Sequence, residues 1–598
     1  MTITVPSILR AAALAVVLCV GQAAEPANAV RLVQLDGAWQ LQRAGKPWVV
    51  RGAGGDASKS VLASIGGNTT RTWGADGIQD RLDDAHKAGL GVIIGIWLGH
   101  ERHGFNWSDK QAVQRQFEMA KRQVQQWKDH PALIAWGLGN EMEGFQAGDN
   151  ENIWRGIEEI ARMVKEIDPH HPTMTTTAEI GGKRVEMLHK LCPSIDIMGI
   201  NSYAGAPSIP ARYRAAGGTK PYIITEYGPP GTWEIGKNPL GAVDEPTSTA
   251  KAASYKAAYE ALTADSKLCL GTVAFAWGSK VEATATWYGM VLPDGAKLEV
   301  VDMYAQAWGR PVANRCPQIQ PISFDVGAHP TVKPGALIAA TAAVTDPEQD
   351  HMQAEWIIAQ ELSNYDTGGD AIEHPPTFPD AIVTSGVGTC QLKAPAGGGV
   401  YRLYTYVRDG KGGAALASAT FKVDGPALPP RPAKAKLPAI IAGGEGEPLW
   451  SASGFMGDAG AIQMEAASTD QPKVGKDCLK VTFAKDKGWG GVVWQSPAND
   501  WGEKPGGWDL GPATALKFWV RGATGGEKIK FGFGVIGNDK KFGDSAKIER
   551  EVTMTTEWQE VVLDVSGRDL SRIKTGFMWV AGAQGKPFTF YVDHARWE

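Results

Sequence analysis

A chain of 598 residues has room for about four domains at roughly 150 residues each, or three if one is a barrel of about 250 residues. With 43% hydrophobic and 21% charged residues, its composition is that of a globular protein and excludes disorder throughout. The net charge of −5 provides no basic excess for neutralising phosphates, so we expect no nucleic-acid partner. The 22 tryptophans fall mainly before residue 310 and after residue 449, which indicates two aromatic-rich modules.

Residues 1–29 have the pattern of a signal peptide. Arg10 precedes a short apolar run at residues 11–20, and Ala27-Asn28-Ala29 is a small-residue cleavage site. This run is too short to span a bilayer. We therefore expect no membrane span and a secreted protein, periplasmic or extracellular, with a disordered or buried N-terminal helix as the alternative.

Between residues 47 and 310, apolar runs alternate with longer amphipathic stretches. Eight such runs occur, at residues 47–52, 68–73, 92–98, 133–139, 173–177, 195–201, 222–225 and 272–277. Eight strand–helix repeats over roughly 260 residues predict a (β/α)8 TIM barrel, which we place at residues 30–312. A doubly wound sheet is the competing architecture, but the glycine-rich segment 52–60 lacks a complete phosphate-binding pattern.

After the barrel, the sequence becomes typical of antiparallel sheets. Residues 317–424 contain alternating strands and turns that predict an immunoglobulin-like β-sandwich. A proline-rich linker is expected at residues 425–440. Residues 445–598 show no helical periodicity and predict a jelly-roll-like sandwich that contains the second tryptophan group.

Five cysteines follow the predicted leader and are widely scattered. Because no C-x-x-C pair occurs, we expect no zinc site, and we expect no cofactor. The odd number leaves at least one thiol unpaired, and the pairings Cys192–Cys269 and Cys316–Cys390 stay open.

Two glutamates end apolar runs on opposite sides of the predicted barrel. Glu141 follows the fourth run and Glu226 follows the seventh. The C-terminal ends of barrel strands form the active-site face, and strands 4 and 7 lie across its mouth. Glycoside cleavage commonly uses two opposed carboxyl groups, because one donates a proton to the leaving oxygen and the other acts at the anomeric carbon. Two surface ion pairs are the alternative interpretation.

The sequences around both glutamates resemble a known family. The stretch DHPALIAWGLGNE at residues 129–141 resembles the acid/base strand of the clan A glycoside hydrolases, in the style of the barrel domain of glycoside hydrolase family 2. The stretch KPYIITEYG at residues 220–228 is similar to the nucleophile strand of that clan. The resemblance covers about residues 35–312. It departs from family 2 in one respect, since the first predicted strand begins too soon after the leader for two preceding sandwich domains.

The resemblance implies a retaining mechanism in which Glu141 is the general acid/base and Glu226 is the nucleophile. It also implies that Asn140 contacts the sugar 2-hydroxyl, that the guanidinium of Arg71 keeps Glu226 charged, and that Tyr203 lies near the nucleophile. From the residues alone, Arg71 would be a rim ion pair and Tyr203 a packed loop residue.

Other candidates lie near the ends of the predicted strands. Trp277 matches the family's platform under the reacting sugar, with a core tryptophan as the alternative. We expect one of the histidines after strand 3 to reach the cleft and select His100 for substrate binding. Glu143 and Glu179 are candidates for substrate hydroxyls, and solvated loop residues are the more ordinary reading. Four further tryptophans are candidate sugar subsites: Trp73, Trp97, Trp107 and Trp233.

Together these features predict a secreted retaining β-glycoside hydrolase that cleaves a β-linked polysaccharide or oligosaccharide, with β-glucan as the first choice. A transglycosylase of the same mechanism and a catalytically silent carbohydrate-binding surface protein are the alternatives. Residues 515–520, 556–561 and 590–593 resemble strands of carbohydrate-binding modules, with a sandwich whose tryptophans are core as the structural alternative. In such a module Asp593 is a candidate calcium ligand. The oligomeric state stays open.

Overall fold

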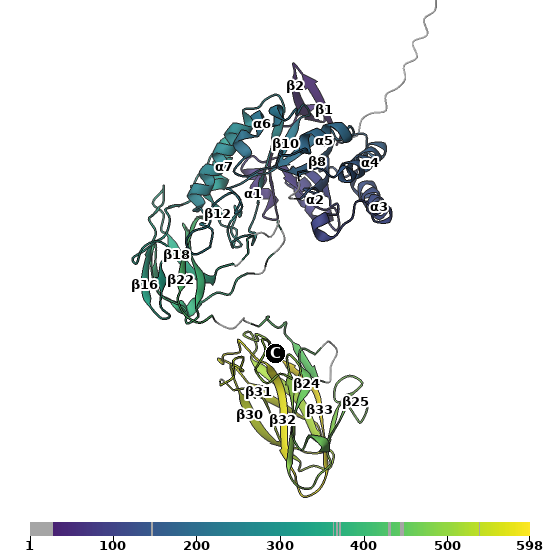
Figure 1. Cartoon of the computed structure of the whole chain (residues 1–598), viewed down its shortest axis with the longest axis vertical. Coiled ribbons are helices and arrows are strands. Elements are labelled where there is room, and N and C mark those ends of the chain that lie inside the picture. Colours follow the sequence, from purple (N-terminus) through teal and green to yellow (C-terminus); the bar gives the residue numbers. More distant parts are fainter. Residues whose placement is uncertain are drawn as a thin grey trace, which may run out of the picture. The chain divides into compact units, whose positions relative to one another are not determined.

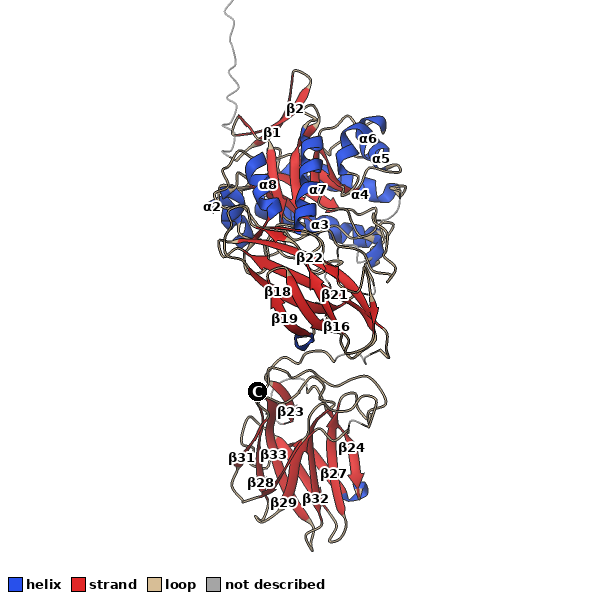
Figure 2. Cartoon of the chain, turned by 90° about the vertical axis from the view of Figure 1, so that its left-hand side faces the viewer, coloured by secondary structure: helices blue, strands red, loops and turns tan. Residues whose placement is uncertain are grey.

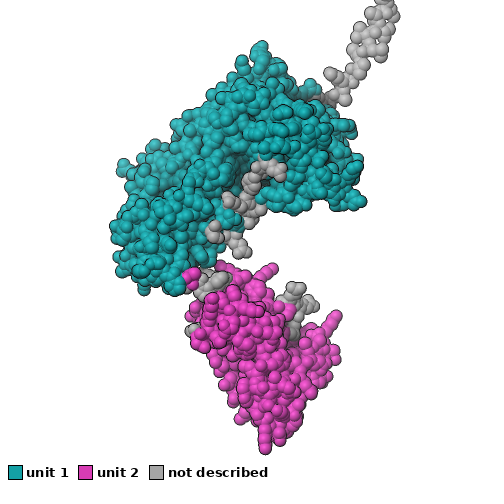
Figure 3. Space-filling model, viewed as in Figure 1, with its two compact units in different colours: residues 1–426 teal, residues 427–598 magenta. Residues whose placement is uncertain are grey.

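The computed structural model describes residues 28–598, except residues 145–146, 363, 366–368, 370–371, 373, 428–431, 443–447 and 538. Nearly all of the predicted leader, and part of the predicted linker, therefore lie outside the described residues. The chain divides into two compact units, residues 1–426 (unit 1) and residues 427–598 (unit 2) (Figure 3). Over the described residues, no helix combines the length and apolar character that a membrane crossing requires.

Unit 1 contains a closed barrel of eight parallel strands, which confirms the predicted TIM barrel. Its strands are β4 (Val50–Gly54), β5 (Thr69–Arg71), β6 (Gly91–Ile96), β7 (Leu133–Asn140), β8 (Thr173–Ala178), β9 (Ile197–Asn201), β10 (Tyr222–Glu226) and β11 (Cys269–Phe275). A parallel sheet is covered on both faces, so its strands are almost continuously apolar. All six residues of β6 are buried, which is why simple apolar runs revealed the barrel.

Helices surround these strands (Figure 1). They are α1 (Lys59–Ser64), α2 (Gln79–Lys87), α3 (Lys110–Trp127), α4 (Glu151–Ile167), α5 (Arg184–Leu191), α6 (Ile209–Ala215), α7 (Ser248–Thr263) and α8 (Glu299–Ala307), with short η1 (Glu101–His103) and η2 (Ala206–Ser208). Asp109 and Asn150 directly precede α3 and α4, and their side chains cap these helices by accepting hydrogen bonds from backbone amides of the first turn. A small sheet of β1 (Val30–Leu35), β2 (Ala38–Arg43) and β3 (Lys46–Pro47) packs Val30 and Leu41 against the barrel interior.

The rest of unit 1 is an antiparallel sandwich with its own core, called here the middle sandwich. Its strands are β13 (Gln318–Ile319), β14 (Ser323–Phe324), β15 (Thr331–Val332), β16 (Leu337–Thr341), β17 (Val344–Thr345), β18 (Gln353–Gln360), β19 (Ile382–Gly386), β20 (Thr389–Lys393), β21 (Gly399–Arg408) and β22 (Gly413–Val423), with η3 (Pro379–Ala381). One further strand, β12 (Lys297–Leu298), precedes α8 and pairs with β22. The barrel part therefore supplies a strand to the sheet of the middle sandwich.

Unit 2 is a sandwich of two antiparallel sheets, and every described α-helix lies outside it (Figure 2). One sheet contains β23 (Ala439–Ala442), β25 (Ile462–Ser468), β26 (Cys478–Phe483), β28 (Ala515–Gly522), β31 (Gln559–Asp564) and β33 (Phe588–Trp597). The other contains β24 (Ser451–Gly457), β27 (Trp489–Gln495), β29 (Lys528–Phe533), β30 (Ile548–Thr553) and β32 (Thr575–Gly582), and η4 (Ala459–Ala461) precedes β25. The predicted multidomain fold class is thus confirmed.

The tryptophans of unit 2 divide between core and surface. Trp494, Trp579 and Trp597 are buried in the main cluster of the sandwich. Trp489 and Trp501 are 48% and 38% exposed. The five described cysteines are all free thiols, so neither pairing that the sequence left open is formed.

Candidate active site

Glu226 ends β10, and three side chains donate hydrogen bonds to its carboxylate. Arg71 Nη1 and Trp73 Nε1 donate to Oε1 over 3.0 and 2.7 Å, and Tyr203 Oη donates to Oε2 over 3.1 Å. The side chain is only 10% exposed. A guanidinium and two neutral donors stabilise negative charge on this carboxylate. The strand ends of β5, β9 and β10 thus place a buried carboxyl group with three hydrogen-bond donors at the mouth of the barrel.

Glu141 directly follows β7 and has a different environment. Its φ of 55° lies in the left-handed region, which non-glycine residues adopt rarely and which concentrates at functional sites. Asn201 Nδ2 donates to its Oε1 over 2.6 Å. Burial, and then the negative charge of Glu226, raise the pKa of Glu141 to about 7. Near neutral pH, Glu141 therefore exchanges its proton easily.

The two carboxyl groups are connected by one chain of hydrogen bonds. Arg71 Nη2 donates to Asn140 Oδ1 over 2.6 Å, and Asn201 Nδ2 donates to the same oxygen over 3.2 Å. Arg71 also bonds to Glu226, and Asn201 also bonds to Glu141. Five side chains from four strand ends thus form one preorganised polar cluster.

Residues 82–259, from α2 to α7, match the family model of the TIM barrel domain of glycosyl hydrolases family 2. This segment contains β6 to β10 and both glutamates. The barrel is that of a glycoside hydrolase. The predicted resemblance to the family 2 barrel is therefore confirmed over this segment.

Several solved structures are similar to the chain at low identity. An endo-beta-1,4-mannanase from Thermotoga petrophila has 13% identity and a TM-score of 0.33, and the match covers 63% of this chain and 98% of that one. A beta-D-glucuronidase from Dictyoglomus thermophilum has 14% identity and a TM-score of 0.37, with 47% of this chain and 54% of that chain covered. The chain thus spans about half the length of that glucuronidase. A comparison with curated proteins found no match.

In this glycoside hydrolase barrel, Trp277 is not a sugar platform. Its side chain is only 1% exposed, it belongs to the main barrel core, and its Nε1 donates to the carbonyl of Ser58 over 3.1 Å. A ring without an open face has no surface on which a sugar can stack. The burial fits the core alternative, and the prediction of a platform at Trp277 is corrected accordingly.

Exposed aromatic rings lie elsewhere around the site. Trp233 is 62% exposed and meets the ring of Tyr203 edge-on, with 5.5 Å between centroids. Trp97 is 40% exposed and stacks on His100 at 4.8 Å. Since His100 is itself buried, the structure makes it a support for Trp97 and does not expose it to the cleft.

The two additional glutamates have partners within the protein. Glu143 is buried, pairs with Arg184 over 2.9 Å and accepts from the amide of Ala178 over 2.6 Å. It is neither the substrate-facing group nor the solvated loop residue that the sequence suggested. Glu179 is part-buried and pairs with Arg212 over 2.8 Å.

Asn201 is the site residue whose contacts the sequence did not reveal. It ends β9, it is buried, and its Oδ1 accepts from Thr225 Oγ1 over 2.7 Å while its NH2 group reaches both Asn140 and Glu141. The sequence did contain a signal for Asn201, because this polar residue ends an apolar run, as Glu226 does.

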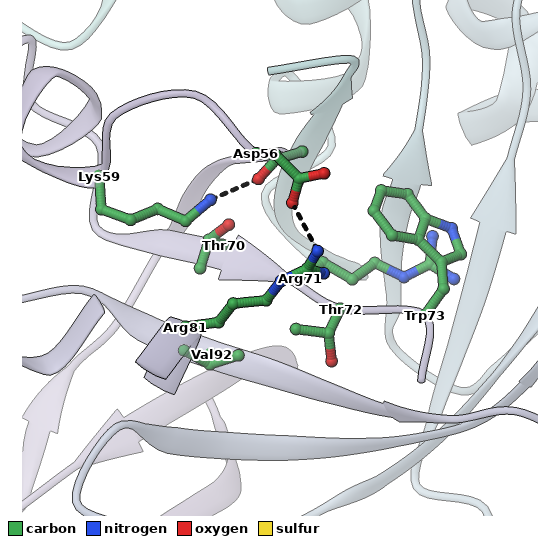
Figure 4. A pocket seen from close by; sticks show the side chains of 9 residues that line it. Asp56, Lys59, Thr70, Arg71, Thr72, Trp73, Arg81 and Val92 are labelled. Atoms are coloured by element: carbon green, nitrogen blue, oxygen red, sulfur yellow. Dashed lines mark hydrogen bonds and ion pairs between the residues drawn. The ribbon is translucent and has the colours of Figure 1, made fainter. Parts of the chain in front are cut away.

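A small cavity is lined by the side chains of Arg71, Trp73, Lys59 and Arg81, among others (Figure 4). Its volume is about 10 Å³, which admits at most one water molecule and excludes a substrate or an organic cofactor. Asp56 pairs with Arg81 at its edge over 3.2 Å. Within the described part of the chain, no group of three or more His, Cys, Asp or Glu side chains has a metal-binding arrangement.

Proposed function

We propose that this glycoside hydrolase is a secreted retaining enzyme that cleaves β-linked polysaccharides or oligosaccharides by double displacement. The unequal environment of the two glutamates carries the proposal. Glu226 receives three hydrogen bonds that favour a negative charge, whereas burial raises the pKa of Glu141 to about 7. A pair of carboxyl groups in which one environment favours the charged form and the other favours the protonated form is typical of a nucleophile and a general acid.

In the first step, a carboxylate oxygen of Glu226 bonds to the anomeric carbon while Glu141 protonates the departing glycosidic oxygen. In the second step, the deprotonated Glu141 takes a proton from water, and the water oxygen displaces Glu226. Arg71 and Tyr203 keep the nucleophile in place through their hydrogen bonds to its two oxygens. Asn140, which Arg71 and Asn201 orient, is the proposed contact to the sugar 2-hydroxyl.

The polymer substrate is supported by exposed aromatic rings. Trp97 and Trp233 in unit 1, and Trp489 and Trp501 in unit 2, present indole surfaces on which the apolar faces of sugars can stack. A second module with such rings suits a long substrate better than a disaccharide. The leader-like N-terminus supports export to a compartment where polysaccharides occur, and β-glucan is the first polymer to test.

The test is a panel of aryl β-glycosides and β-linked polysaccharides, with release of reducing ends as the readout. Proton NMR of the first product supports the proposal if the β-anomer forms before mutarotation, and an initial α-anomer would overturn retention. The matched control is Glu226→Gln, which keeps the side-chain size and removes the nucleophile. No turnover by the wild type on any member of the panel, with binding of polysaccharide retained, would establish the silent binding protein instead.

A further inference from the structure

A segment of the middle sandwich reaches the loops that follow β10 and β11. Two of its residues, Leu362 and Tyr365, come soon after β18. They belong to an apolar cluster with residues of the barrel and its loops. The barrel members of this cluster are Trp73, Tyr203, Ile235, Val243, Phe275, Ala276, Ala283, Trp287 and Tyr288. Lys280 Nζ donates to the carbonyl of Gly369 over 3.1 Å, which adds a polar contact to the same surface. Because β10 ends in Glu226, this part of the sandwich packs beside the proposed nucleophile's own loop.

A buried ion pair fixes the segment. Arg402 of β21 bonds to Glu361 over 2.6 Å, and both side chains are at most 4% exposed. Arg402 Nη2 donates to the carbonyl of Val243 over 2.7 Å. Tyr365 Oη donates to Glu361 over 2.7 Å and accepts from the amide of Val243 over 3.4 Å. Tyr365 therefore joins the sandwich pair to the barrel loop that follows β10.

A second buried pair extends this network to the loop after β11. Glu245 forms an ion pair with Lys251 of α7 and accepts from Thr286 Oγ1 over 2.7 Å. Ser418 of β22 donates to its other oxygen over 3.3 Å. Lys251 also donates to the carbonyl of Thr286 over 2.8 Å. One network thus holds both barrel loops against two strands of the middle sandwich.

Buried ion pairs add little stability compared with apolar packing, but they penalise every arrangement that leaves one charge alone. The network is next to the aromatic side chains around Glu226, since Tyr288 lies two residues after Thr286. The ring of Tyr288 is 5.3 Å from the ring of Tyr203, whose hydroxyl donates to Glu226. If the loop of Tyr288 is held in place, the Tyr203 hydroxyl is therefore also held in place as a donor to Glu226.

We propose that the middle sandwich is part of the catalytic unit and that Tyr365 is a positioning residue. Through Glu361 and Arg402 it fixes the loop of Val243. Arg402 Nη1 also donates to Ser418 Oγ over 3.1 Å, and Ser418 donates to Glu245, which holds the loop of Tyr288 through Thr286. The two loops hold the Tyr203 hydroxyl on Glu226. This inference rests on the proposed function, in which Glu226 is the nucleophile.

The test measures kcat and KM of full-length variants on the best aryl β-glycoside of the panel. Tyr365→Ala is expected to lower kcat by about tenfold with KM changed by less than about threefold, since small misplacements of a catalytic group cost rate. Tyr365→Phe keeps the ring, loses the two hydroxyl bonds, and is expected to lower kcat about threefold. The matched control is Tyr401→Phe in the same sandwich, whose buried hydroxyl donates to the carbonyl of Gly397 over 2.8 Å. It should leave kcat unchanged.

A double-mutant cycle with Tyr203→Phe separates positioning from general destabilisation. Once the Tyr203 hydroxyl is absent, Tyr365→Ala should cost less than about threefold in kcat. Full additivity of the two losses, or equal effects of Tyr365→Phe and Tyr401→Phe, would overturn the inference and leave the proposed function intact. An inactive wild type would overturn both. If Tyr365→Ala does not fold, the cycle is run with Tyr365→Phe, and additivity there has the same meaning.

Discussion

The raised pKa of Glu141 predicts that the conservative variant Glu141→Gln is more stable than the wild type at alkaline pH. Gln keeps an amide oxygen that can accept from Asn201 Nδ2, as Glu141 does over 2.6 Å. It has no charge to bury near Glu226. The substitution therefore removes the electrostatic cost of the site while leaving its packing in place.

The sign and the size follow from proton linkage. The folded protein holds a proton on Glu141 up to a pH of about 7, whereas the unfolded chain releases it near 4.5 because that is the ordinary pKa. Between these values the folded state binds more protons, so the free energy of unfolding of the wild type falls as pH rises. The difference in pKa corresponds to about 3 kcal/mol. It is absent below pH 4.5 and complete above pH 7.

Differential scanning calorimetry of the two proteins from pH 4 to pH 8 measures this difference. We expect equal Tm values at the acidic end and a Tm for Glu141→Gln that is higher by a few degrees at pH 8. The control is Glu179→Gln, because Arg212 and Ser202 hold the pKa of Glu179 below its usual range in spite of burial. That variant should be less stable at neutral pH and converge with the wild type as pH falls. A Tm difference for Glu141→Gln that does not depend on pH would refute the reasoning.

Three further predictions concern activity. Glu226→Ala should be inactive, and azide should restore turnover and yield a glycosyl azide of inverted configuration. Chromatography and NMR detect this product, and near wild-type hydrolysis would show that another group is the nucleophile. Glu141→Ala should lose roughly 10²–10⁴-fold in kcat on substrates with poor leaving groups and far less on activated aryl glycosides. Equal losses on both, in parallel kinetic assays, would indicate a structural role. A chain ending at Pro426 should retain activity on short soluble oligosaccharides and lose rate on long or insoluble polymer, because unit 2 has its own core and raises the local substrate concentration. Reducing-end assays on both substrates check this, and a loss on short oligosaccharides would show that unit 2 completes the site.

The barrel and its two glutamates were accessible from the sequence because buried parallel strands are apolar along their whole length. A carboxylate at the end of such a run, as in β7 and β10, stands out against it. The position of the Trp277 ring was harder to predict. The sequence around a tryptophan at a strand end is the same whether its ring faces the cleft or, as here, the core.

The network of Glu245, Lys251, Glu361 and Arg402 could not be predicted from the sequence. Each residue reads as an ordinary surface charge in its local context. Its members are buried only because the middle sandwich packs against the barrel loops, and that contact joins residues more than a hundred positions apart, such as Arg402 and Val243. Local patterns contain no information on such a pairing.

The parallel pairing of β12 with β22 has a consequence for engineering. Lys297 and Leu298 lie opposite Gly413 and Ala414, so a chimaera joined between the last barrel helix and β13 would cut through a shared sheet. The barrel half would keep β12 without its partner strand, and the sandwich half would lose this edge strand and expose the unpaired edge of β22 to aggregation. A transplant of this barrel into another scaffold should therefore carry every residue to Pro426, where the compact unit ends.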